Sequence, residues 1–186
     1  MQTRETQDLS LADQHRINEL NRTYPHLIES LRGEKCTQVH FSYGDELCLG
    51  FGPLSPCQHP KLTHLQRGTW ELCTRATPWK IFRGGKVVLN SEDPKTDEEI
   101  AEIKARTQDI LQDKTLQNLT LDPETLETNL SFAGSFSHDA NYSLILYPDL
   151  WGEDQLQHWV LWMPSEQVLT IGPSYQWSYR SMRDRA

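Results

Sequence analysis

The sequence predicts an α+β fold, built mainly from antiparallel β-sheet meanders with two helices and divided into two structurally related halves. Three observations predict it. Two segments place apolar residues three and four positions apart, many short segments alternate apolar and polar residues, and both parts of the chain repeat one order of elements. Helices repeat every ~3.6 residues and strands every two, so the spacings distinguish them. We expect a single domain over residues 10–180, with halves at 10–93 and 94–180, a disordered start at 1–9 and a tail at 181–186.

The first helix is expected to begin at Ser10, whose side chain suits the N-cap, and to end near Gly33. Pro25 is expected to break or kink it, because proline lacks the amide hydrogen. The second helix is expected to begin at Thr96 or Asp97 and to end near residue 112. The apolar stripes that predict these helices are Leu11, Ile17, Leu20, Tyr24, Leu27, Ile28 and Leu31 in the first, and Ile100, Ile103, Thr107, Ile110 and Leu111 in the second.

Alternating residues predict the strands. In the first half, a strand over 36–43 leads through a turn at Gly44-Asp45 into a return strand that carries Leu47, Leu49 and Phe51. Residues 52–67 are expected to form a long loop. Further strands are expected at 69–75, 79–82 and 86–89, and in the second half at 116–121, 126–132, 142–146, 159–162, 168–171 and 175–179.

The two halves match in their order of elements. Each has a helix, a hairpin, a polar loop and then a strand that opens on Trp-x-Leu, at Trp70-Glu71-Leu72 and at Trp159-Val160-Leu161. One meander of strands always looks somewhat like another. The sequence therefore leaves open whether the match reflects a duplication.

These Trp-x-Leu strands, together with the segment from Trp79-Lys80-Ile81 through Val88-Leu89-Asn90-Ser91-Glu92-Asp93, carry a resemblance. The chain resembles small uncharacterised bacterial domains with two β-rich halves, some of which occur as immunity proteins beside polymorphic toxins. The likeness covers residues 31–93 and extends over 116–179. It implies a non-catalytic protein that binds another protein, and it carries over no catalytic residue.

The charge balance excludes one class of partner. The chain of 186 residues has a formal net charge of −8, from 26 acidic and 18 basic residues. Phosphate backbones are bound by clustered Lys and Arg, and here the basic residues cluster only in the short tail Arg180, Arg183 and Arg185. Nucleic acid is therefore not an expected partner. An acidic surface steers basic or amphipathic proteins instead.

A cytoplasmic location is expected. The polar start of the chain lacks the apolar segment of a secretory signal, and the longest apolar runs, at 144–147 and 159–163, are too short to span a bilayer. We therefore expect no membrane insertion, and we expect reduced thiols at the cysteines Cys36, Cys48, Cys57 and Cys73. The oligomeric state is not predicted.

Several groups suggest chemistry, but each has a simpler interpretation. Cys57, His59 and His64 carry zinc-ligating atoms without the paired spacing of a structural zinc site. Cys48 is expected to lie near His40 across the hairpin, with no third group to orient a nucleophilic pair. The sequence Ser137-His138-Asp139 is typical of a turn, and the acidic residues of 92–102 suit a helix start. We expect no catalytic residue, metal or cofactor.

Aromatic residues supply the candidate binding site. Trp151 lies in a polar connector and Trp79 follows a proline, so both are expected to be surface anchors, since Trp and Tyr dominate interface hot spots. Tyr175, Trp177 and Tyr179 fall on one face of the last strand. The sequence does not decide whether this face is core or surface, although the modest apolar content favours core.

Two functions are consistent with these features of the sequence. The first is a non-catalytic protein–protein interaction module that binds through an aromatic patch with an acidic rim, at Trp151, Trp79, Tyr175 and Trp177. The alternative is a small-ligand or sugar-binding domain, or a hydrolase, whose pocket is covered by the loop 52–67. His59, His64 and His138 are the polar groups of that alternative. The lack of a catalytic constellation favours binding over chemistry.

Overall fold

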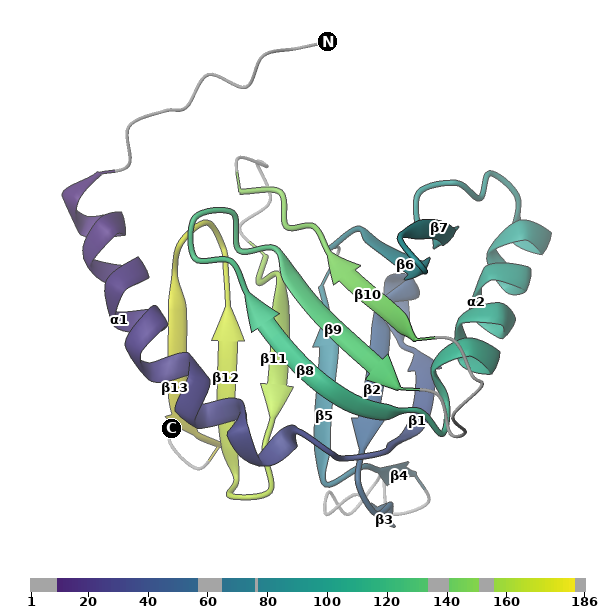
Figure 1. Cartoon of the computed structure of the whole chain (residues 1–186), viewed down its shortest axis with the longest axis horizontal. Coiled ribbons are helices and arrows are strands. Elements are labelled where there is room, and N and C mark those ends of the chain that lie inside the picture. The colour runs from purple at the N-terminus through teal and green to yellow at the C-terminus, as the bar shows by residue number, and fades with distance from the viewer. Residues whose placement is uncertain (1–9, 57–64, 76, 134–140, 151–155, 183–186) are drawn as a thin grey trace, which may run out of the picture.

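The structure is a computed structural model that describes residues 10–56, 65–75, 77–133, 141–150 and 156–182. It confirms an α+β fold, with two helices and antiparallel sheets of six and five strands. Figure 1 shows the five-stranded sheet lying across the front of the six-stranded sheet, with one helix at each side.

Both helices begin where the sequence predicts. Helix α1 (Leu11–Ile28) follows Ser10, whose hydroxyl accepts a hydrogen bond from the Asp13 amide, and a 3₁₀ turn at Glu29–Leu31 continues it. Helix α2 (Asp97–Leu111) begins with a capping box, in which Thr96 and Glu99 each bond the backbone amide of the other. The expected break at Pro25 is wrong. The helix runs through Pro25, because Tyr24 and Ile28 on either side of it are buried in the core.

The six-stranded sheet has the order β1-β2-β5-β11-β12-β13, and the five-stranded sheet has the order β7-β6-β10-β9-β8. The strands of the first are β1 (Cys36–Phe41), β2 (Leu47–Phe51), β5 (Trp70–Thr74), β11 (Trp159–Trp162), β12 (Gln167–Ile171) and β13 (Trp177–Ser181). Those of the second are β6 (Trp79–Arg83), β7 (Lys86–Asn90), β8 (Thr115–Leu121), β9 (Thr128–Ala133) and β10 (Tyr142–Leu146). Within the segment 52–67, β3 (Ser55–Pro56) pairs with β4 (Gln66–Arg67) as a small hairpin.

The two halves exchange hairpins. The meander β1-β2-β5 of the first half is extended by the hairpin β11-β12 of the second, and the meander β8-β9-β10 of the second half is extended by the hairpin β6-β7 of the first. The strand order of one sheet therefore corresponds to that of the other. The last strand, β13, has no counterpart in the five-stranded sheet.

Matching residues follow the same correspondence. Lys35 and Thr115, which open the two meanders, form a β-bridge with each other, and both first strands carry a bulge just after this point. Phe51 and Phe132 occupy equivalent positions, and their rings stack with centroids 6.4 Å apart. The partner of Trp159 in this correspondence is Trp79, not Trp70, because β6 rather than β5 occupies the place of β11.

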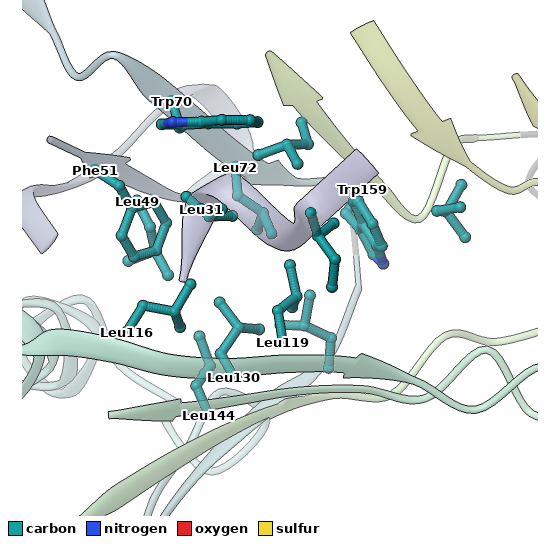
Figure 2. Close-up of a cluster of buried hydrophobic side chains, with 14 of the residues drawn as sticks. Leu31, Leu49, Phe51, Trp70, Leu72, Leu116, Leu119, Leu130, Leu144 and Trp159 are labelled. Atoms are coloured by element: carbon teal, nitrogen blue, oxygen red, sulfur yellow. The ribbon is translucent and has the colours of Figure 1, made fainter. Parts of the chain in front are cut away.

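The core lies between the two sheets. Figure 2 shows Leu49, Phe51 and Leu72 of the six-stranded sheet facing Leu116, Leu130 and Leu144 of the five-stranded sheet. Trp70 and Trp159 lie in neighbouring strands, where Leu72 and Leu161 are direct cross-strand partners that join the halves. Burying each such side chain contributes about 1.5–3 kcal/mol. The large aromatic anchors therefore compensate for the short aliphatic runs.

The cysteines differ from the expectation of reduced thiols. Cys48 and Cys73 are cross-strand partners on β2 and β5 and form a disulfide, whereas Cys36 is a free, buried thiol. Burial raises the pKa of the Cys36 thiol to about 12, so it stays protonated and unreactive at neutral pH. Cys57 lies outside the described residues.

Candidate peptide-binding groove

Each edge of the six-stranded sheet borders a groove whose other wall is a helix. The β13 groove, between β13 and α1, is lined by Arg16, Glu19, Thr23, Gln176, Trp177, Ser178 and Tyr179. The β1 groove, between β1 and α2, is lined by Thr37, Gln38, Val39, His40, Phe41, Leu54, Lys104, Ala105, Gln108 and Gln112. Figure 1 shows that α1 and α2 stand at opposite sides of the molecule, beside β13 and β1 respectively.

The helix wall of the β13 groove is one stripe of α1. Arg16, Glu19 and Thr23 are three and four positions apart and so share a face of the helix. The adjacent face carries the buried residues Ile17, Leu20, Tyr24 and Ile28. The amphipathic pattern thus anchors α1 in the core and turns a polar stripe toward β13.

The hydrogen-bond phase of β13 determines which of its peptide groups face the groove. The Gly172 amide donates to the Gln176 carbonyl at 2.7 Å, and the Met182 amide donates to the Glu166 carbonyl at 2.8 Å. Antiparallel pairs alternate, so Gln176, Ser178 and Arg180 direct their peptide groups at β12. Trp177 and Tyr179 direct theirs away from the sheet, and among the described residues these peptide groups have no partner.

The side chains of the same two residues point to the side of the sheet that α1 covers. Trp177 packs partly against the core, and its indole N–H donates to the Arg16 carbonyl at 3.2 Å. Tyr179 is 42% exposed, among the most exposed large apolar side chains of the described chain. Trp177 and Tyr179 therefore combine unpaired backbone groups with aromatic rings on one short edge.

Tyr175 lies at the beginning of this edge, in the turn before β13. The expected strand over 175–179 starts two residues later, at Trp177. Tyr175 is 6% exposed and its hydroxyl donates to the Glu124 carbonyl at 2.8 Å. Burial raises the pKa of this hydroxyl, as do the negative charges of Asp13, Glu124 and Asp122. The aromatic series thus runs from core at Tyr175 to surface at Tyr179.

The expectation that Trp79 is a surface anchor is wrong. Trp79 is 3% exposed, its ring lies 6.3 Å from that of Phe41, and its amide bonds the Ser91 hydroxyl. A side chain enclosed between the two sheets presents no area to a partner. Trp151, His59, His64 and His138 lie outside the described residues, and so does Ser137-His138-Asp139.

His40 and Cys48 are cross-strand partners, as predicted from the hairpin. The disulfide of Cys48 with Cys73 removes the thiol that a nucleophilic pair needs. His40 instead lies 4.0 Å from the Glu71 carboxylate. Within the described part of the chain, no three His, Cys, Asp or Glu side chains are grouped to hold a metal ion, and neither helix is long and apolar enough to cross a membrane.

The fold and the groove define a two-layer α+β protein with exchanged hairpins and, among the described residues, a sheet edge beside a helix with unpaired outward peptide groups. No family model, no curated protein and no solved structure matches the chain. The sequence pattern placed Tyr175 and Trp177 among the binding residues, but it gave no sign of Arg16, Glu19 and Thr23. These polar residues look like any solvated helix face until the sheet order places β13 beside them.

Proposed function

We propose that this protein is a non-catalytic interaction module, which binds an extended segment of another protein by strand addition to β13. One observation carries the proposal: the outward peptide groups of Trp177 and Tyr179 border an open groove whose opposite wall is α1. In strand addition, backbone hydrogen bonds supply affinity and pockets for alternate side chains supply specificity. The β13 groove offers both elements.

The neighbouring edges support the choice of β13. Exposed sheet edges promote aggregation, and proteins protect them with bulges, charges or covering elements. The edge strand β1 has a bulge between Cys36 and Gln38, and the Lys104 side chain of α2 lies over the Phe41 ring and pairs with Asp45. On β7, Arg106 of α2 donates to the Val88 carbonyl. Within the described residues, β13 has comparable cover only beside the Trp177 indole.

The partner is expected to be a separate protein. This agrees with what the resemblance to immunity proteins implies, since those proteins act by binding a toxin. An acidic chain with a net charge of −8 also repels its own copies, which disfavours self-association at the same edge.

A proline substitution tests strand addition at one peptide group. Tyr179→Pro removes an amide hydrogen that β12 does not use, so the fold should be retained. Tyr179→Val is the matched control, because it removes the same ring and keeps the amide. Peptides selected from a random phage-displayed library should bind Tyr179→Pro at least ~10-fold more weakly than Tyr179→Val, since a hydrogen bond is lost and the ring of proline blocks the approach.

Ser178→Pro is the control for the effect of proline on the stability of the fold. This substitution removes an amide that bonds β12, so it should lower the free energy of unfolding by about 3 kcal/mol in denaturant titrations, whereas Tyr179→Pro should change it by less than ~1 kcal/mol. Equal affinity of the selected peptides for Tyr179→Pro and Tyr179→Val rejects strand addition at β13. Failure of the library to yield any binder also counts against the proposal.

A further inference from the structure

We infer that the segment bound at the β13 groove is basic, with Lys or Arg at alternate positions whose side chains enter between β13 and α1. This inference rests on the proposed strand addition and adds the chemistry of the partner. It follows from the register of the edge, the charges around it and the aromatic rings that face it.

Register determines which partner side chains enter the groove. A strand added to β13 bonds the outward peptide groups of Trp177 and Tyr179, so two of its residues lie directly opposite these two. Residues directly opposite in a sheet project their side chains to the same face. Those two partner side chains therefore lie on the α1 side, and the residue between them projects beside Ser178 on the other face.

The charges near the Trp177 end of the groove are mainly negative. Glu19 lines the groove, and Asp13, Asp122 and Glu124 are close enough to raise the pKa of the Tyr175 hydroxyl, two residues before Trp177. Of the basic residues, Arg16 is already paired with Asp13 at 3.3 Å. Arg180 alternates with Tyr179 along β13 and so projects to the opposite face. Since Arg16 and Asp13 pair with each other, a cation entering from β13 meets the remaining carboxylates of Glu19, Asp122 and Glu124.

The aromatic rings favour the same charge. Lys and Arg side chains are attracted to the faces of Trp and Tyr rings. This fold already makes such contacts on the five-stranded sheet and its flank, where Arg83 lies 5.7 Å from the centre of the Tyr142 ring and Lys80 lies 5.2 Å from that of Tyr147. The partly exposed Trp177 and the exposed Tyr179 offer equivalent surfaces to a partner.

Designed peptides test the charge and the alternation separately. Four fluorescently labelled twelve-residue peptides are compared by anisotropy: alternating Thr-Lys, alternating Thr-Glu, alternating Thr-Val, and a block peptide with the lysines and threonines in pairs. The alternating Thr-Lys peptide should bind best, and the block peptide, of equal charge, should bind at least ~5-fold more weakly because its lysines cannot all face one side.

Variants that remove single charges test where the lysines of the peptide contact the protein. Glu19→Gln and Asp13→Asn should each weaken the alternating Thr-Lys peptide about two- to fivefold, as expected for partly exposed ion pairs. Glu98→Gln, an exposed carboxylate at the start of α2, is the matched control for net charge and should leave the affinity unchanged. Tyr179→Pro should abolish binding of the peptide.

The outcomes separate this inference from the proposed function. If the Thr-Val or Thr-Glu peptide binds as tightly as the Thr-Lys peptide and Tyr179→Pro still blocks it, strand addition stands and the basic partner is rejected. If the block peptide binds as tightly as the alternating Thr-Lys peptide, or if Glu98→Gln loses as much affinity as Glu19→Gln, net charge alone explains the attraction. Either result also rejects the basic partner. A dimer in sedimentation that Tyr179→Pro dissociates assigns the edge to a second copy and overturns both proposals.

Discussion

The β1 groove and the β13 groove have the same arrangement of elements but differ in how the helix covers the edge strand. Each lies between an edge strand of the same sheet and a helix, and each edge directs two neighbouring peptide groups outward, at Val39 and Phe41 in β1 and at Trp177 and Tyr179 in β13. At β1, Lys104 reaches across from α2 to the Phe41 ring and to Asp45. At β13, the described residues of α1 contact the Trp177 indole, while the Tyr179 ring is exposed.

The difference between the two edges shows how an edge strand becomes a binding site. Both strands are equally able to pair, since the backbone is the same, so what distinguishes them is the cover supplied by the helix. In α2 the covering residue is a long cation that crosses to the strand, whereas in α1 the long cation of the stripe, Arg16, pairs with Asp13 of its own helix. Three predictions test this comparison, in order of decreasing effect.

The largest effect is expected from the core that both grooves share. Trp159 is fully buried between the sheets and donates its indole N–H to the Thr128 hydroxyl at 2.9 Å. Trp159→Ala should lower the free energy of unfolding by about 3–5 kcal/mol, measured by urea denaturation. Both edges belong to one sheet, so amide exchange should accelerate in β1 and β13 together. Acceleration confined to β13 would show that the two grooves are not held by one core.

An intermediate effect is expected from pH, acting on the β13 side first. His158 is buried beside Gly172, a position with positive φ where any Cβ would overlap the imidazole. Burial lowers the pKa of His158 below its ordinary value of 6.5. The unfolded chain therefore binds a proton more readily, so stability is full above pH ~6.5 and falls as the pH decreases toward the folded pKa. Exchange at β12 and β13 should accelerate at pH 5.5 before exchange at β1 does.

The control for the pH effect is His158→Gln, which removes the titrating group. It should lower stability at neutral pH because it disturbs packing, but it should flatten the dependence on pH between about 7.5 and 5.5. If the slope of stability against pH is the same in this variant, His158 is not the group that controls it.

The smallest effect is expected from uncovering β1. Lys104→Ala removes a partly exposed ion pair and a cation–π contact, which should lower stability by less than ~1 kcal/mol. If Lys104 protects the edge, the variant should acquire binding of edge-seeking peptides at β1, detected as new protection of the Val39 and Phe41 amides. Asp109→Ala, on the exposed surface of α2, is the comparison variant and should gain no binding.

Local features of the fold were predictable, and long-range ones were not. Apolar spacing gave both helices and nearly every strand, because each is a property of neighbouring residues. It misplaced Trp79, since a tryptophan after Pro78 reads as exposed unless the pairing of β6 with β10 is known. The hairpin exchange could not be predicted either. Alternation of apolar and polar residues shows that one side of a strand is apolar, but it does not show which sheet the strand joins.

The candidate site was predictable only in part. Trp177 stood out as an aromatic on a short strand, and Tyr175 was included with it although it is buried. The groove itself requires that β13 be an edge, that its hydrogen-bond phase expose Trp177 and Tyr179, and that α1 lie beside it. The spacing of residues in the sequence predicts none of these three conditions. The disulfide was missed for a similar reason, since pairing Cys48 with Cys73 requires the register of β2 against β5.

The exchanged hairpins have a consequence for how the chain holds together. Neither half can complete a sheet from its own strands, because each meander is extended by a hairpin that belongs to the other half. A backbone cut in the connector between β7 and α2 would thus yield two pieces with complementary unfinished edges. Such pieces should reassemble as a heterodimer when mixed, while either alone should lack a stable core.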